Sequence, residues 1–414
     1  MALKFLATIS KVSPVGCSNR LCKTSRSHNV KQVASLTRLA YKKSDAQKPA
    51  PFPYWKKKFG LYHVIFDPVL YRYDGNTKLI VVDGPPAIGK AKFCEKLADE
   101  FGLLYMPAPT HDEFYINHYG VDLRELDPKL PFLCKSYDVP RYLENPNDKR
   151  VARFQMVYLH MRTEQYINAL LHLLSTGQGV VLNRSVYSDS VFAEVMKNFG
   201  YISEHVYAHY TRISTIAKNY FLRPHLIIYL DVAPEIVKEK IKQKGIPYEV
   251  NSKVLTTKYL TDLENVYKEK YLKKMADHSH LLIYDWSKEG DLTSVVEDIE
   301  ELDLANYEQN KMSDWVFNEP DEIIKLRYQY GQDRYTIFRD MVQFNEPDFP
   351  SELIWTPEEV IAMDEALENS TSEKFLPGFI EKLGDKVLWK SDKYEYPSYR
   401  RTPRDFVNRA KYMS

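Results

Sequence analysis

The sequence has few cysteines and no long hydrophobic run. Its 414 residues include four cysteines, of which Cys17 and Cys22 lie near the N-terminus. Cys94 and Cys134 have neither a C-x-x-C partner nor a nearby histidine pair, so a disulfide framework and a zinc site are unsupported. We expect no metal site, no iron–sulfur cluster and no FAD. Because no stretch approaches the roughly 18 consecutive apolar residues of a membrane span, we expect any membrane association to be peripheral.

Acidic residues are missing from the first part of the chain. The whole sequence is balanced, with 57 basic and 56 acidic residues, so it has no overall field that would attract nucleic acid. Residues 1–44, however, contain no Asp or Glu, and their basic residues are spread among many Ser and Thr. This composition is typical of a mitochondrial transit peptide, and Leu3, Phe5, Leu6 and Ile9 suit an amphipathic import helix. A basic tail that binds nucleic acid is the less favoured alternative.

Three further segments differ in their apolar pattern. Residues 45–78 are rich in aromatic residues and proline, which predicts an extended arm. Residues 79–302 alternate short apolar runs with helical segments, and residues 303–414 have many aromatic side chains but weak periodicity. We expect the last segment to pack on its own core or on a partner protein, and the 79–302 domain to fold without it.

The alternation in 79–302 predicts an α/β domain. The expected strands are 79–83, 179–182, 225–232 and 281–284, and the expected helices are 90–101, 150–175 and 234–244. Strands that are apolar throughout and separated by helices indicate a parallel sheet that is covered on both faces. The fold class is therefore a three-layer α/β fold.

A phosphate-binding loop is the sharpest local signal. Gly84, Gly89 and Lys90 form the pattern G-x-x-x-x-G-K between an apolar strand and a helix with a buried stripe, which favours a P-loop over an ordinary glycine turn. Such a loop wraps phosphate with backbone N–H groups at a helix N-terminus. Pro85 and Pro86 remove two amide donors. Ala91 stands where a Ser or Thr hydroxyl usually ligates Mg²⁺, so metal-assisted catalysis is compromised.

Together with segments downstream, the loop resembles the deoxynucleoside kinase family over about residues 79–286. Family members carry Glu-Pro-Val after the first helix, Phe-Gln on a long helix, Glu-Arg-Ser or Asp-Arg-Ser at a strand end, and an arginine-rich lid. The counterparts here are Ala108-Pro109-Thr110, Phe154-Gln155, Asn183-Arg184-Ser185 and the run from Lys238 to Lys244. The resemblance implies a P-loop NTPase fold of nucleoside-kinase type.

The departures from the family pattern concern catalysis. The family's glutamate before proline is the general base, and Ala108 cannot take a proton; Asn183 lacks the charge of the family's acid. We therefore expect no catalytic residue. The resemblance still implies a nucleotide-binding site formed by Gly84, Ala87, Ile88, Gly89, Lys90, Ala91 and Arg184. It implies a nucleoside pocket that includes Phe154, Gln155 and Asn183. It also implies a lid with Lys238 and Lys242. A core-facing amide at Gln155 and a solvated basic helix at the lysines remain open alternatives.

One branch of this family fits best, the kinase-like accessory subunits of respiratory complex I, which residues 173–193 closely resemble. The resemblance implies a non-catalytic subunit on the matrix side of the mitochondrial inner membrane, in contact with other complex I subunits. Its kinase-like domain would bind a purine nucleotide, ATP or a deoxynucleoside triphosphate, with the part of Mg²⁺ left open. The alternatives are an active mitochondrial deoxynucleoside kinase and a nucleotide sensor.

Overall fold

The computed structural model describes residues 36–38 and 48–369, with gaps at 56, 58, 61, 64–66, 117–121, 289, 305–311, 318 and 343–348. All of these belong to one unit of the chain, residues 32–414. The transit peptide expected at 1–44 lies outside the described residues except for 36–38, and it stays a prediction. Within those three residues, Leu36 is buried and Arg38 forms a 2.9 Å ion pair with Glu300.

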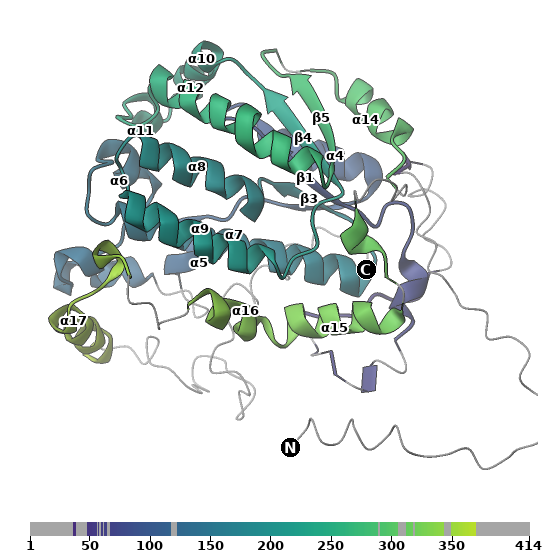
Figure 1. Cartoon of the computed structure of the whole chain (residues 1–414), viewed down its shortest axis with the longest axis horizontal. Coiled ribbons are helices and arrows are strands. Elements are labelled where there is room, and N and C mark those ends of the chain that lie inside the picture. Colours follow the sequence, from purple (N-terminus) through teal and green to yellow (C-terminus); the bar gives the residue numbers. More distant parts are fainter. Residues whose placement is uncertain are drawn as a thin grey trace, which may run out of the picture. The chain divides into compact units, whose positions relative to one another are not determined.

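A parallel sheet organises the described part of the chain (Figure 1). Its five strands have the order β2-β3-β1-β4-β5. They are β1 Leu79–Asp83, β2 Leu104–Met106, β3 Val180–Asn183, β4 Leu226–Asp231 and β5 His280–Asp285. Every strand pair is parallel, and β1 is buried along its whole length. The parallel strand pairs confirm the α/β fold that the apolar strands predicted. Strands of a parallel sheet are apolar throughout because helices cover both faces of such a sheet.

Helices cover the two faces of the sheet (Figure 1). On one face, α4 contacts α14, and on the other α7, α8 and α9 contact one another, with α12 packed on α8. The bounds are α4 Lys90–Phe101, α7 Val151–Thr176, α8 Val186–Asn198, α9 Glu204–Lys218, α10 Pro234–Lys244, α12 Thr257–Val266 and α14 Leu292–Glu301. The expected helices 90–101 and 234–244 have the observed bounds, whereas the sequence pattern did not identify β2, α8, α9 or α12. No helix in the described ranges is both long and apolar enough to cross a lipid bilayer.

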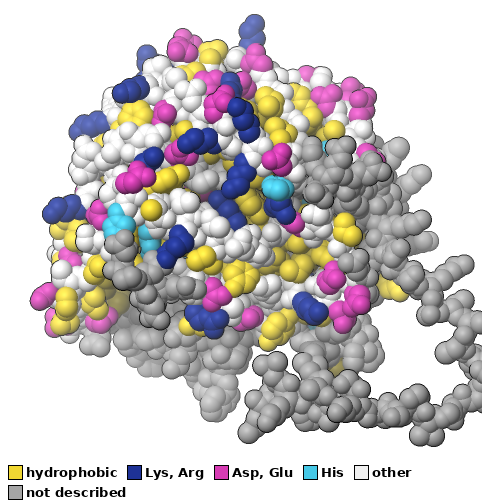
Figure 2. Space-filling model, in the orientation of Figure 1, with side chains coloured by type: hydrophobic (Ala, Val, Ile, Leu, Met, Phe, Trp, Pro, Cys, Tyr) yellow, Lys and Arg dark blue, Asp and Glu magenta, His cyan; other side chains and the backbone are white. Residues whose placement is uncertain are grey.

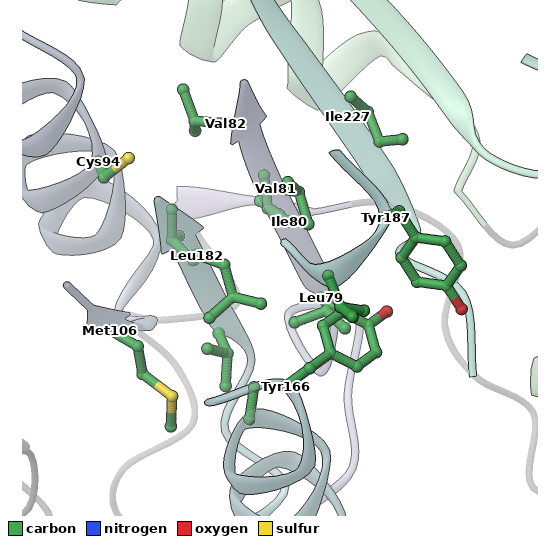
Figure 3. Packing of buried hydrophobic residues seen from close by; sticks show 14 of the residues in the cluster. Leu79, Ile80, Val81, Val82, Cys94, Met106, Tyr166, Leu182, Tyr187 and Ile227 are labelled. Carbon is green, nitrogen blue, oxygen red and sulfur yellow. The ribbon is translucent and has the colours of Figure 1, made fainter. Parts of the chain in front are cut away.

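The hydrophobic core lies between the sheet and these helices (Figure 3). Leu79 and Val81 on β1 and Leu182 on β3 belong to one cluster with Tyr166 on α7 and Tyr187 on α8. Tyr166 is fully buried, and its hydroxyl donates a 2.7 Å hydrogen bond to the carbonyl of Leu222. The polar end of this large core residue is therefore satisfied, as burial requires.

Shorter elements connect the main ones. They are η2 Pro68–Arg72, α5 His111–Tyr115, η3 Leu123–Lys129, η4 Phe132–Cys134, α6 Val139–Glu144, α11 Pro247–Val250, η5 Tyr267–Leu272, α13 Lys273–Ala276, η7 Ser313–Trp315 and η8 Ser351–Leu353. Of these, η5 is a π-helix that joins α12 to α13. Single-turn π segments inside α-helices often occur at functional sites.

Both flanking segments pack on the core in their described parts. In the N-terminal flank, Phe52, Tyr54 and Phe59 are buried. In the C-terminal flank, α15 Pro320–Gly331 packs on α7 and α16 Arg334–Met341 packs on α9, while α17 Pro357–Glu368 contacts η3 and η4. Tyr330 and Ile337 are fully buried. The described part of the C-terminal segment thus packs on the protein's own core, one of the two expected outcomes. Independent folding of residues 79–302 and a partner-binding role for 303–414 stay predictions.

Candidate nucleotide-binding site

The loop between β1 and α4 has the backbone geometry of an anion cradle. Gly84 has a φ of 144°, and a Cβ at this position would lie 2.6 Å from the carbonyl oxygen of Leu230 on β4. Gly89, the N-cap of α4, has a φ of 84° and provides no side-chain cap. The first amides of α4 are thus left for a ligand, and the helix dipole favours an anion there. Only glycine fits the tight approach at Gly84.

Lys90 lies folded against this loop. Its Nζ donates to the carbonyl of Gly84 at 3.0 Å and also to that of Pro85. The side chain is buried, and burial, followed by repulsion from Arg184, lowers the pKa of Lys90 to about 7. A charge held among backbone carbonyls without a paired anion is poorly stabilised, and a phosphate group would supply the missing negative charge.

Two arginines converge on the same region. Arg184, at the end of β3, has a φ of 66°, and its guanidinium lies 3.5 Å from the ring centroid of Phe192. Arg162 on α7 is buried, and its Nη1 donates to the carbonyl of Asn183 at 2.9 Å. Burial, followed by repulsion from Arg184, lowers the pKa of Arg162 to about 10. The Nε atoms of both arginines are buried without a hydrogen-bond partner, so both can donate to an anionic ligand.

Sequence reasoning missed Arg162. The signal is present, because an arginine in the middle of the apolar helix α7 is costly to bury unless an anion or a polar network receives it. Arg162 contacts the end of β3 through its hydrogen bond to Asn183. The helix period of α7 does not predict this contact, because it depends on how α7 packs against β3.

Asp83 and Asn183 occupy the carboxyl ends of the adjacent strands β1 and β3. Asn183 pairs with Val82, and Asp83 follows Val82 by one residue. Asp83 is fully buried and accepts a 2.6 Å hydrogen bond from the hydroxyl of Tyr271. Burial raises the pKa of Asp83, an effect that hydrogen bonds from Ser188 and Tyr271 oppose. One oxygen of Asp83 and the side-chain oxygen of Asn183 are buried without a partner.

Within the described ranges, no three His, Cys, Asp or Glu side chains lie together in a group that could hold a metal ion. Ala91, at the start of α4, is exposed and has no hydroxyl. The oxygens of Asp83 and Asn183 are suitable in kind for Mg²⁺, but two protein ligands leave most of the coordination shell to phosphate and water. The site therefore fits a phosphate chain better than a tightly bound metal.

The side chains expected in a nucleoside pocket are held by the protein itself. Gln155 is buried, and its amide nitrogen donates a 2.9 Å hydrogen bond to Asp189, which also accepts from Tyr210 at 2.7 Å. Phe154 stacks with the ring of Tyr142, with centroids 4.9 Å apart. The ring of Phe154 also contacts the rings of His111 and Tyr158, with centroid distances of 5.1 and 5.0 Å. This region is thus an aromatic cluster beside a closed amide–carboxylate network.

The expected lid lysines do not lie with the loop. Lys238 on α10 donates to the carbonyl of Leu255 at 2.7 Å, and Lys242 is exposed. Lys240 and Lys244, on another side of α10, instead line a cavity of about 400 Å³ beside Gly89. Trp286 forms an aromatic wall of this cavity. The combination of lysines and an indole beside a phosphate loop is suited to an aromatic base that carries phosphates.

The sequence matches the family model "Deoxynucleoside kinase" over residues 80–325. It is 34% identical over 344 residues to "NADH dehydrogenase [ubiquinone] 1 alpha subcomplex subunit 10, mitochondrial" of Mus musculus, a match that covers 81% of this chain and 90% of the mouse protein. It is 27% identical over 265 residues to a deoxyguanosine kinase of Dictyostelium discoideum, which covers 61% of this chain and 84% of that enzyme.

A solved structure of deoxyadenosine kinase from M. mycoides with bound dCTP is similar at 19% identity with a TM-score of 0.38, and it covers 53% of this chain and 96% of that one. The family match spans the loop, the sheet described above, and the three basic residues Lys90, Arg162 and Arg184. The similarity to the mouse subunit covers more of the chain than the family match does. The chain belongs to the deoxynucleoside kinase family, and it is a relative of the complex I alpha subcomplex subunit 10 proteins within that family.

Proposed function

We propose that this protein is a non-catalytic accessory subunit of mitochondrial respiratory complex I, in which the P-loop holds a purine nucleoside triphosphate without turning it over. The observation that carries the proposal is the pairing of an intact phosphate cradle with the loss of catalytic groups around it. Lys90, Arg162 and Arg184 gather at the loop, whereas Ala91 and Ala108 have no group that can ligate a metal or take a proton.

Nucleotide binding is supported by charge and by unsatisfied polar atoms. The three cations outnumber the carboxylates that lie nearest to them, Asp83 and Asp189. The buried Nε atoms without partners give an anion something specific to bind. A nucleotide that binds the folded protein stabilises it by mass action, by about 2.7 kcal/mol when its free concentration is 100 times Kd.

Turnover makes separate demands. Phosphoryl transfer needs Mg²⁺ held against the phosphates and a base beside the attacking hydroxyl. A positioned general base contributes roughly 10²- to 10⁴-fold to the rate, and Ala108 offers none. The network of Gln155 and Asp189 further ties up the amide that the family resemblance assigns to the base of a nucleoside.

The role in complex I is supported by the similarity to the mouse subunit over most of both chains and by the transit-peptide composition of residues 1–44. A subunit imported into the matrix and lacking a membrane span would sit peripherally on the matrix side of the inner membrane. We expect the bound nucleotide to contribute to stability or assembly and no part of electron transfer to pass through this chain.

Two measurements on the native protein test the proposal. Blue-native electrophoresis of mitochondria should place the chain in an assembly of respiratory-complex size. Radiolabelled phosphate transfer from ATP to each of the four deoxynucleosides, with equilibrium nucleotide binding on the same preparation, should show binding and no transfer above background. The alternative is an active mitochondrial deoxynucleoside kinase. It would be established if the protein migrates as a small soluble oligomer and transfers phosphate in a reaction that Lys90→Ala abolishes. Absence of both binding and transfer would reduce the loop to a structural feature.

A further inference from the structure

A second cavity lies outside the nucleotide site, between α8 and α9 on one side and η5 and α13 on the other. Its volume is about 560 Å³, within the range of small-molecule sites. Figure 2 shows Lys and Arg side chains gathered around a hollow near the middle of the face on which α8 and α9 lie. We call this cavity the α8–α13 groove. Tyr271 separates it from the nucleotide site, because Tyr271 lines the groove while its hydroxyl donates to Asp83.

Most charges of the groove are already paired. Arg223 makes two contacts to Asp314, at 2.5 and 2.6 Å, and Lys270 pairs with Glu194. Two lysines that line the same groove, Lys218 on α9 and Lys274 on α13, have no ion pair among the described residues. The groove thus carries two positive charges in excess of its own carboxylates.

These two lysines line opposite walls of the groove, Lys218 from α9 and Lys274 from α13. Burial is the main cause that lowers the pKa of Lys218 to about 8; the charge of Asp189 opposes the shift, and that of Lys274 adds to it. Asp189 is not a free counter-ion, because one of its oxygens already accepts from Gln155 and Tyr210. Like charges that converge in a partly dehydrated groove are unfavourable unless an anion lies between them.

A third polar group points to the same ligand. Ser214, one turn before Lys218 on α9, lines the groove with only 2% of its surface exposed, and its hydroxyl is buried without a hydrogen-bond partner. A buried hydroxyl left unpaired costs about 1–3 kcal/mol, so such atoms usually have a partner. Apolar side chains form part of the remaining lining, among them Val191, Phe221 and Met275, and polar side chains such as Thr211 and Asn219 lie beside them.

We propose that the α8–α13 groove binds a phosphate monoester with an apolar or aromatic body. The phosphate lies between Lys218 and Lys274 and accepts from the Ser214 hydroxyl, and the body rests on the apolar lining. A phosphate monoester carries about two negative charges near pH 7, which matches the two unpaired lysines. The same headgroup chemistry occurs in a nucleoside monophosphate and in a phosphatidic acid. The π-helix η5 contributes Lys270 and Tyr271 to this wall.

Calorimetric titration of the purified full-length mature protein, in buffer without phosphate, tests the proposal. The probes are AMP, dioctanoyl phosphatidic acid and inorganic phosphate. The variants are Lys218→Gln/Lys274→Gln, the single Lys274→Gln, and the control Lys273→Gln, which changes a neighbouring lysine that is exposed and pairs with Glu269 outside the groove. Because Lys274 is exposed, its single variant should fold even if the double variant does not.

We expect at least one ester to bind the wild type and Lys273→Gln equally, inorganic phosphate to bind more weakly, and each lost lysine to weaken ester binding by roughly tenfold or more. Preference for AMP identifies a soluble ester, and preference for the phosphatidic acid identifies a lipid. The proposal is overturned if neither ester binds, if inorganic phosphate binds as tightly as both, or if the lysine variants bind like the wild type. In the last case the ester occupies the P-loop site, and the proposed function is unaffected.

Discussion

Arg327 on α15 forms a buried ion pair with Asp67, with 2.5 Å between Nη1 and Oδ2, although 260 residues separate them in the chain. The guanidinium also lies 3.8 Å from the ring centroid of Phe59. Burial is the main cause that lowers the pKa of Arg327 below its usual range, and Asp67 opposes that shift. This contact joins the N-terminal and C-terminal flanks of the kinase-like domain to each other.

Replacing Arg327 with alanine should therefore destabilise the protein strongly. Loss of one partner of a buried pair typically costs about 3–5 kcal/mol, because the remaining charge is left uncompensated. Urea unfolding followed by circular dichroism measures this change. Arg339→Ala is the control. Arg339 is exposed, and among the described residues its ion pair is with its neighbour Asp340, so we expect an effect within about 0.5 kcal/mol. Equal effects from both variants would contradict a structural role for the Arg327 pair.

Two truncations separate the parts of the C-terminal segment. Removal of residues 328–414 should yield an unstable or aggregating domain, because it takes away the buried side chains Tyr330, Ile337 and Phe338 and exposes the surfaces of α7 and α9 that α15 and α16 cover. Removal of residues 370–414 leaves every one of these contacts in place. We expect this shorter truncation to melt within a few degrees of the full chain in scanning calorimetry. A stable domain after the longer truncation would restore the view that the segment is a separate arm.

Gly84→Ala should abolish nucleotide binding or folding. A Cβ there would lie 2.6 Å from the carbonyl oxygen of Leu230, and the φ of 144° is unfavourable for any other residue. Gly60→Ala is matched to it, because a Cβ at Gly60 meets nothing within 4 Å. Nucleotide affinity and melting temperature, measured side by side, should be unchanged in Gly60→Ala. Normal nucleotide affinity in Gly84→Ala would show that the loop adapts without this glycine.

Lys90 predicts opposite pH trends for folding and for binding. Its pKa is about 7 in the folded, nucleotide-free protein and about 10.4 in an unfolded chain. Between these values the unfolded chain binds more protons, so the contribution of Lys90 to stability increases as pH rises from 7 toward 10. A nucleotide favours the protonated lysine, so its affinity should fall above pH 7, by up to about tenfold per pH unit.

Calorimetric binding at pH 6.5, 7.5 and 8.5, in buffers with different ionisation enthalpies, measures the proton uptake. Lys90→Met should bind more weakly and lose the part of the pH slope and of the proton uptake that Lys90 causes. A wild-type affinity that is constant over this range would mean that Lys90 is already fully protonated without nucleotide.

Restoring single catalytic groups should rescue little activity. Ala108→Glu returns a carboxylate, but Ala91 still lacks a hydroxyl ligand for Mg²⁺ and Asn183 still lacks the charge of the family's acid. Residues that act as a unit contribute non-additively. We expect Ala108→Glu alone to remain at background and the triple variant Ala91→Ser/Ala108→Glu/Asn183→Asp to show the larger gain in phosphate transfer from ATP. Substantial transfer by Ala108→Glu alone would mean that the metal site functions without a hydroxyl at position 91.

Local patterns were enough for much of the fold. The strand β1, the loop and α4 could be predicted from the sequence because their signals lie within a few residues: a fully apolar run, two glycines and a lysine, and a helical stripe that ends at Gly102. The short strand β2 gave no such signal, since three residues cannot show a period.

The sequence alone determined the parallel α/β class, the position of the glycine-rich loop after β1, and the small apolar side chains at Ala91 and Ala108, because each depends on residue type or on short spacing. Only the tertiary structure decided that Arg162 joins Lys90 at the loop, that Lys240 and Lys244 face the neighbouring cavity in place of Lys238 and Lys242, and that the aromatic flanks complete the core. Those facts depend on which elements meet after long stretches of chain. The spacing of residues along the chain does not predict such tertiary contacts, because the free energy that selects them comes from burying apolar surfaces against each other.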